Sequence, residues 1–243
     1  MKTIFYTNNT TISGASVRGV SHKENRLPNQ DSFLCKKNKN GVVLVAADGV
    51  GSHKYSKRGS ISVCKAVCKV FDLYLKKKIA KDDIGKTIEF FYKKLIKKRY
   101  SCQAATTCLF ALIYNNSEII IGQAGDGVIL LRVDDRFVVF KNKNDDFLNE
   151  VSTLDCKREF SNWKIKNLKV DFDTNYRIQI MLSTDGISED IKPDKREICM
   201  DFFINKAKQK YGILHELTNW QVPGSFDDKT VVIFSWEKQN EGI

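Results

Sequence analysis

Aspartates stand at the ends of several apolar runs in this 243-residue sequence. Three of them, Asp48, Asp126 and Asp185, follow runs rich in β-branched and aliphatic residues, and a glycine comes directly after each. Asp227 comes shortly before the apolar run 230–234, and Asp31 comes just before a shorter one. Because short apolar runs bounded by turn residues are typical of strands, the pattern predicts that these carboxylates lie at strand ends.

Such a set of carboxylates could bind divalent cations. The strand ends of a sandwich gather at its edge, and clustered carboxylates repel one another unless cations neutralise them. A ligand set made only of oxygen, without His or Cys, favours hard ions such as Mg²⁺, Mn²⁺ or Ca²⁺. An Asp-Gly pair is also the preferred turn of a hairpin, and Asp126-Gly127 fits that interpretation equally well. The spacing therefore supports a metal site but does not name the reaction.

The elements that must position these aspartates are mainly strands. Very short connections after residue 105 require antiparallel pairing, and apolar residues at helical spacing predict two amphipathic helices within 61–95. Weaker helical patterns occur near 197–219, and the polar segment 142–176 fits either a long loop or a small insertion. We therefore predict an α+β fold, an antiparallel sandwich with helices outside it. The expected strands are about 15–20, 32–37, 42–47, 105–114, 117–124, 127–133, 136–141, 178–183 and 229–236.

The net charge of +11 comes from one stretch of the chain. Residues 54–100 hold 15 basic and 4 acidic residues, so the remainder is neutral. The lysines fall on the outer faces of the two predicted helices, which leaves three interpretations open. They are a solvated surface, a docking surface for an acidic or phosphorylated partner, and a nucleic-acid surface. Nucleic acid is disfavoured, because the aromatic residues of this stretch largely occupy the apolar stripes.

The seven cysteines have no spacing typical of disulfides or zinc sites. Their odd number, together with Cys64 and Cys68 on an apolar helix face, favours a reducing, cytoplasmic setting. The three histidines are scattered and form no zinc signature. No apolar run approaches the roughly 18–20 residues of a membrane-spanning helix, and the first residues become polar too soon for a signal peptide. We therefore expect neither a membrane span nor a signal peptide.

The motifs and their order resemble the metal-dependent protein phosphatases of type 2C, most closely their compact bacterial branch. The resemblance covers about residues 12–236. It implies a single phosphatase-like domain over 1–243, with α-β-β-α layers and two Mn²⁺ or Mg²⁺ ions, with or without a third, at one end of the sandwich. The motifs are Asn29-Gln30-Asp31, Ala47-Asp48-Gly49-Val50-Gly51-Ser52-His53, Ala105-Thr106-Thr107, Gly125-Asp126-Gly127, Ser183-Thr184-Asp185-Gly186 and Asp227-Asp228-Lys229-Thr230.

The resemblance assigns roles to the residues of the two-metal site. Asp48 would bridge both metals, and Gly49 would offer its carbonyl oxygen. Asp185 and Asp227 would each complete the coordination of one metal. Asp48, Asp185 and Asp227 are therefore the expected catalytic residues.

The resemblance places two further aspartates around that site. Asp31 would hold metal-bound water from outside the two-metal site. Asp126, alone or with Thr107, would match a looser third-metal position.

The sequence departs from the family where the substrate phosphate is held. Family members often have an arginine shortly before the first acidic motif, and here His22, Lys23 and Arg26 are the candidates. A histidine that some members use as general acid is replaced by Val50. His53 lies close to that position and is a candidate general acid, with an ordinary surface histidine as the alternative.

The implied activity is hydrolysis of phosphoserine and phosphothreonine monoesters by a metal-bridged hydroxide. Two metals would lower the pKa of a bridging water and clamp the phosphoryl oxygens, so the mechanism needs no protein nucleophile. The sequence accordingly lacks a Cys-x5-Arg loop, a Gly-x-Ser-x-Gly elbow and a Walker P-loop. The alternative is a catalytically weak regulatory protein of the same fold that binds phosphoproteins. We expect a monomer with phosphoprotein substrates and a cognate Ser/Thr kinase system as candidate partner.

Overall fold

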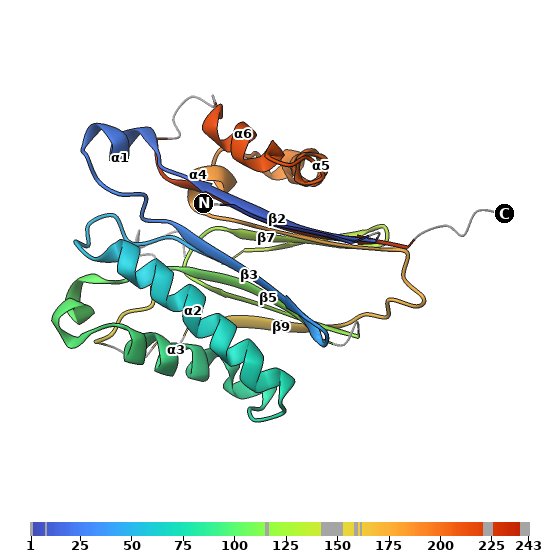
Figure 1. Ribbon diagram of the computed structural model, residues 1–243, viewed down its shortest axis with the longest axis horizontal. Coiled ribbons are helices and arrows are strands. Elements are labelled where there is room, and N and C mark those ends of the chain that lie inside the picture. Colours follow the sequence, from blue (N-terminus) through green and yellow to red (C-terminus); the bar gives the residue numbers. More distant parts are fainter. Residues whose placement is uncertain are drawn as a thin grey trace.

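Two antiparallel β-sheets pack face to face, and helices cover the outer face of each sheet (Figure 1). The structure is a computed structural model, and it describes residues 2–7, 9–114, 117–141, 153–157, 160, 162–220 and 226–238. The layers follow the order α-β-β-α, which confirms the predicted α+β sandwich.

The first sheet has six strands in the order β1-β2-β11-β10-β7-β8. Neighbouring strands in both sheets run antiparallel. The strands of the first sheet are β1 (Lys2–Thr7), β2 (Thr10–Val17), β7 (Val128–Val133), β8 (Arg136–Phe140), β10 (Arg177–Ser183) and β11 (Lys229–Glu237). The second sheet has five strands in the order β3-β4-β5-β6-β9. They are β3 (Ser32–Asn38), β4 (Gly41–Ala47), β5 (Cys108–Tyr114), β6 (Glu118–Ala124) and β9 (Lys164–Lys169).

The helices form two groups on opposite sides of the sandwich (Figure 1). The five-stranded sheet is covered by α2 (Ser56–Leu75) and α3 (Ile84–Leu95). The six-stranded sheet is covered by α4 (Asp185–Ser188), α5 (Arg196–Ala207) and α6 (Gly212–Thr218), while the short α1 (Val20–Glu24) follows β2. Three 3-10 turns, at Lys81–Asp83, Lys98–Gln103 and Pro193–Lys195, complete the described elements.

Successive side chains of a strand point alternately into the core between the sheets and into the core between a sheet and its helices. In β4, Leu44 points between the sheets, whereas Val43 and Val45 pack against the α2–α3 layer. In β11, Val232 and Phe234 also lie between the sheets. This period-two pattern with both faces buried explains why β4 and β11 are continuous apolar runs.

Most of the expected strands are confirmed, and three expectations need correction. The strand predicted at 15–20 runs instead from Thr10 to Val17, because it pairs with β1 and β11, and the chain then turns into α1. The strand predicted from residue 105 begins only at Cys108. Residues 105–107 instead form backbone hydrogen bonds with the segment 48–50. The segment 142–176 contains β9, while its residues 142–152, 158–159 and 161 lie outside the described part.

A buried arginine fastens α5 to the six-stranded sheet. Arg132 on β7 is 4% exposed and forms ion pairs with Glu197 (3.1 Å) and Asp201 (2.5 Å) of α5. Its guanidinium also donates to Oε1 of Gln179 at 2.8 Å. The pair with Asp201 raises the pKa of Arg132, which therefore stays charged although it is buried.

Candidate metal centre

Both sheets end in aspartates at the same end of the sandwich. In one sheet, Asp31 directly precedes β3 and Asp48 directly follows β4, and Ser32 pairs with Ala47 between them. In the other sheet, Ser183 of β10 pairs with Val231 of β11 and with Val128 of β7. That register sets three further acidic positions side by side: Asp126 before β7, Asp185 after β10 and Asp227 before β11.

The backbone at Asp48 is fixed by two threonines that precede β5. The amide N–H of Asp48 donates to Oγ1 of Thr107 at 2.9 Å, and its carbonyl accepts from Oγ1 of Thr106 at 2.7 Å. A Cβ on Gly49 would lie 2.6 Å from the backbone of Ser56, so only glycine lets the chain pass the start of α2. Thr107 thus holds Asp48 in place, a role that the sequence alone does not indicate.

Asp31 joins the two sheets through its carboxylate. It is 5% exposed, and its Oδ2 accepts hydrogen bonds from the hydroxyls of Thr184 (2.8 Å) and Thr230 (2.7 Å). Its amide N–H donates to the side chain of Asn29 at 2.9 Å. Asp31 comes from the five-stranded sheet and both hydroxyls from the six-stranded one, so this contact sets how the sheets meet at the site.

The segments that carry Asp185 and Asp227 touch each other directly. A Cβ on Gly186 would lie 2.1 Å from the carbonyl oxygen of Asp228, an approach that no larger residue permits. Asp185 accepts from the Gly186 amide at 2.9 Å, and Asp227 accepts from the Asp228 amide at 2.7 Å. Each carboxylate is thereby held at one oxygen by the amide of the next residue.

Mutual repulsion and burial perturb the carboxylates of this centre. Burial raises the pKa of Asp48 well above its usual value, and Asp31, Asp185 and Asp227 push it in the same direction. Burial, with Asp126 the largest charged contributor, raises the pKa of Asp185 to about 8. Burial also raises the pKa of Asp31 to about 7, against the hydrogen bonds that it accepts.

The pKa of Asp126 is raised too, mainly by burial and then by Glu189 and Asp227, so the hairpin tip belongs to the same electrostatic cluster.

The donor set fits hard divalent cations. It consists of carboxylate oxygens and the nearby Gly49 carbonyl, which are ligands that Mg²⁺ and Mn²⁺ prefer. Cations would also neutralise the repulsion among these carboxylates.

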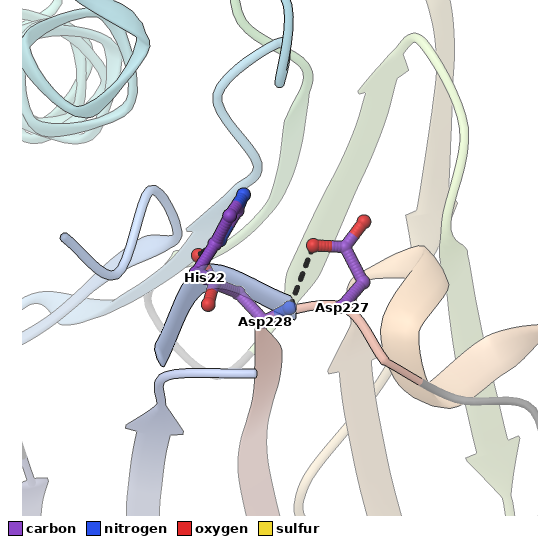
Figure 2. Close-up of side chains that lie close together, drawn as sticks. All are labelled: His22, Asp227 and Asp228. Atoms are coloured by element: carbon purple, nitrogen blue, oxygen red, sulfur yellow. Dashed lines mark hydrogen bonds and ion pairs between the residues drawn. The ribbon is translucent and has the colours of Figure 1, made fainter. Parts of the chain in front are cut away.

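His22 lies at the rim of the centre, beside Asp228, the neighbour of Asp227 in the sequence (Figure 2). Its Nδ1 is 2.8 Å from Oδ2 of Asp228, although the orientation is not that of a hydrogen bond. Asp228 is 1% exposed and accepts from the amides of Gly19 (2.7 Å) and Gln30 (2.5 Å). Ligand atoms of His22, Asp227 and Asp228 all lie within 4.8 Å of one another. Asp228 therefore ties the α1 segment to the centre, which the sequence did not reveal.

The other predicted site residues lie farther from the cluster. Lys23 and Arg26 are exposed on and just after α1, and Arg26 has a positive φ of 55°. His53 is half-buried, and its Nδ1 accepts from the amide of Ala105 at 3.2 Å. Within the described residues, no hydrogen bond or ion pair connects His53 to the aspartates.

A buried lysine is a further feature that the sequence did not single out. Lys229 is 4% exposed, and its Nζ donates to the carbonyl of Asp227 at 2.8 Å. Burial lowers its pKa, while Asp190, Asp227, Asp228 and Asp31 act in the opposite direction. The sequence alone does not show that Lys229, the first residue of β11, is buried. Side chains of a strand point to alternate faces, so the buried face is known only once the pairing of the strand is known.

Comparison with known proteins agrees with this geometry. A family model described as Protein phosphatase 2C matches residues 18–220. No curated protein sequence matches the chain. Across the described residues, none of the helices has the length and apolar character to cross a membrane.

Solved structures share the fold at low sequence identity. RsbX in complex with magnesium is 16% identical with a TM-score of 0.60, covering 98% of this chain and 100% of its own. The Mycobacterium tuberculosis serine/threonine phosphatase PstP/Ppp is 17% identical with a TM-score of 0.64, covering 95% and 100%. PppA, a regulatory component of T6SS in Pseudomonas aeruginosa, is 14% identical with a TM-score of 0.62, covering 93% and 97%.

The family model spans most of the chain, including the strand ends that carry four of the five clustered aspartates. Phosphatases of this family use Mn²⁺ or Mg²⁺ and act on phosphoproteins, which fits the oxygen-only donor set. The chain belongs to the protein phosphatase 2C family and is a metal-dependent protein serine/threonine phosphatase.

Proposed function

We propose that Asp48, Asp185 and Asp227 hold two divalent cations at which this phosphatase hydrolyses phosphoserine and phosphothreonine. The observation that carries the proposal is the convergence of aspartates from both sheets, where burial and neighbouring carboxylates raise the pKa values of Asp48 and Asp185. The Gly49 carbonyl would complete the Asp48 side, and Asp126 would serve a looser third position. When bound, the cations supply an activated water and neutralise the phosphoryl oxygens.

The surrounding residues orient these ligands and the substrate. Thr106 and Thr107 fix the backbone of Asp48, so its carboxylate meets the other ligands without reorganisation. Asp31, held by two threonine hydroxyls, would accept a proton or a hydrogen bond from water at the centre. Contacts of this kind, made within the protein itself, hold catalytic groups in a fixed geometry.

His22 is the best placed of the three candidates for holding the substrate phosphate. Its ring lies beside the Asp227–Asp228 pair, with Nδ1 2.8 Å from Oδ2 of Asp228, so it is the candidate nearest to the carboxylates of the centre. Lys23 and Arg26 are exposed on the same segment and would act by long-range attraction. Nδ1 of His53 accepts the hydrogen bond from the Ala105 amide, so a general acid at this position would have to donate its proton to the leaving oxygen from Nε2.

The cellular setting of the enzyme is inferred from its cysteines and from its similarity to solved structures. We propose a monomeric, cytoplasmic enzyme whose residues 1–243 act as one domain, opposed by a Ser/Thr kinase system and without a nucleic-acid partner. The seven cysteines, all free in the structure, support a reducing compartment. The similarity to the M. tuberculosis serine/threonine phosphatase PstP/Ppp and to the regulatory PppA supports a role in regulation by phosphorylation.

The decisive experiment measures hydrolysis of an aryl phosphate and of a phosphothreonine peptide with Mn²⁺ or with a chelator. We expect activity only with the metal, and Asp48→Asn should reduce kcat by at least 10³-fold while leaving the circular dichroism spectrum unchanged. Full activity of Asp48→Asn would overturn the ligand assignment. A phosphopeptide that binds tightly in calorimetry without turnover would instead identify a catalytically weak, phosphoprotein-binding relative.

A further inference from the structure

A small basic hollow opens beside the metal centre, at the start of α2. Its volume is about 350 Å³. Three of its lining residues are basic and none is acidic, and the basic ones are exposed or half-buried. We call this feature the basic hollow; it is lined by Pro28, Lys54, Tyr55, Lys57, Arg58 and Ile61.

The basic hollow is linked to the metal centre through the first turn of α2. Nζ of Lys57 donates to the carbonyl of Asn29 at 2.6 Å, two residues before Asp31. Ser56, in the first turn of α2, touches Gly49 next to Asp48. A peptide whose phosphorylated residue reaches the aspartates would therefore place its neighbouring side chains at this hollow.

The cations of the basic hollow are not neutralised by the protein. Across the described residues, Lys54, Lys57 and Arg58 form no ion pair with a carboxylate. By contrast, Lys36 on β3 and Lys93 on α3 do pair with carboxylates. Unpaired positive charges side by side create a local potential that attracts anions.

The stability of α2 does not explain why Lys57 and Arg58 stand in its first turn. The amino end of α2 carries the positive end of the helix dipole, so Lys57 and Arg58 in its first turn are unfavourable for the helix itself. Arg58 is nevertheless held in place, with its guanidinium 4.4 Å from the ring centre of Tyr100. That ring in turn packs on Tyr55 at 4.5 Å. An oriented guanidinium loses less entropy on binding a carboxylate than a free one.

We propose that the basic hollow binds acidic side chains next to the phosphorylated residue, so that the enzyme prefers phosphosites in acidic segments. The inference rests on the proposed function, because the aspartate centre must bind the phosphate itself. An acidic peptide is favoured over nucleic acid. The hollow is too small to follow a polynucleotide backbone, and its one tyrosine, Tyr55, packs against the ring of Tyr100 rather than standing free for bases.

The test compares matched phosphothreonine peptides. In one pair, three Glu residues or three Gln residues precede the phosphothreonine, and in a second pair they follow it. With Mn²⁺ at 50 mM salt, we expect kcat/KM to be about tenfold higher for the Glu peptide of at least one pair. The ratio should approach one at 500 mM salt, because the Debye length shrinks to a few ångströms.

Charge reversal assigns the preference to the basic hollow. Lys54→Glu with Arg58→Glu should bring the Glu/Gln ratio to one or below. The matched control, Lys65→Glu with Lys86→Glu, changes the net charge equally at exposed lysines elsewhere and should keep the ratio. Because the readout is a ratio within each variant, a general loss of activity cancels. Lys54→Glu alone repeats the test without disturbing the Arg58–Tyr100 contact.

The outcomes separate this inference from the proposed function. If the wild type hydrolyses the aryl phosphate with Mn²⁺ but shows no preference in either pair, the acidic-substrate inference is wrong and the phosphatase assignment stands. A preference that both double variants lose equally would also overturn it, because net charge alone would then be responsible. If no substrate is hydrolysed, the proposed function fails. Displacement of the Glu peptide by single-stranded DNA at equal charge would point to a nucleic-acid surface instead.

Discussion

Replacing Asp185 by asparagine should stabilise the metal-free protein, although it removes a proposed metal ligand. Burial and the charges of Asp126, Asp31 and Asp227 raise the pKa of Asp185 to about 8. An aspartate with a higher pKa in the folded than in the unfolded chain makes the folded state bind more protons. Its contribution to stability is therefore lost as the pH rises from about 4 to about 8. Asparagine has a similar shape but no charge, so the variant avoids this loss.

The size of the effect follows from the pKa. A rise from 3.8 to about 8 corresponds to on the order of 5 kcal/mol at pH 8, because a tenfold change in proton affinity is worth about 1.4 kcal/mol. The Asp185 side chain is partly exposed, and water and salt screen its charge, which reduces the expected gain to about 2 kcal/mol. For a chain of this length, Tm should rise by about 4–8 °C at pH 8 and by much less near pH 4.5.

Manganese should reverse the order of stability. A cation at 100 times its Kd stabilises the folded state by about 2.7 kcal/mol, and the wild type should gain this while Asp185→Asn gains little. Thermal unfolding at pH 4.5 and pH 8, with EDTA or with Mn²⁺, measures all four conditions. Asp82→Asn, at an exposed carboxylate remote from the centre, is the control and should change neither comparison. Lower metal-free stability of Asp185→Asn at pH 8, or equal stabilisation of both proteins by Mn²⁺, would refute the reasoning.

Three further substitutions test separate parts of the structure. Gly186→Ala places a Cβ 2.1 Å from the Asp228 carbonyl, so we expect at least about 2 kcal/mol of lost stability and weaker Mn²⁺ binding, measured by denaturation and calorimetry. Arg132→Met removes the ion pairs to the half-exposed Glu197 and Asp201 of α5 and leaves the buried Oε1 of Gln179 without its donor, so it should lower the free energy of unfolding by about 1 kcal/mol without changing kcat. Asp228→Asn removes the charge that pairs with the α1 segment, and should raise KM more than it lowers kcat in steady-state assays; an unchanged KM would contradict the anchoring role.

The parts of the fold that the sequence predicted well are those in which burial follows one regular pattern along the element. β4, with its run of aliphatic residues, and the amphipathic α2 have a single pattern that no tertiary contact overrides. β9 was missed because it is an edge strand whose only apolar residues are Ile165 and Leu168, three positions apart among lysines and an asparagine, so it has no period-two pattern. α4 was missed because a helix of one turn has no periodicity to detect.

The place of the candidate ligands at strand ends was predictable for a similar reason. Asp48 and Asp185 each follow a clear apolar run, and the structure has both directly after a strand. The contacts of Asp228 and of Thr107 could not be predicted, because each depends on a partner far away in the sequence: Gly19 and Gln30 for the first, Asp48 for the second. Such partners are set by the pairing of strands and not by local composition.

The threonine hydroxyls that hold Asp31 come from the opposite sheet, and this has a mechanical consequence. The spacing of the proposed metal ligands is set by how the sheets stack, so the sheets cannot slide past each other without separating these aspartates. Side chains in the middle of the sandwich, such as Leu44 and Leu182, therefore act as the spacer of the active centre. Adding or removing a methylene at these positions would shift one sheet relative to the other and would therefore change kcat, although neither side chain touches the substrate.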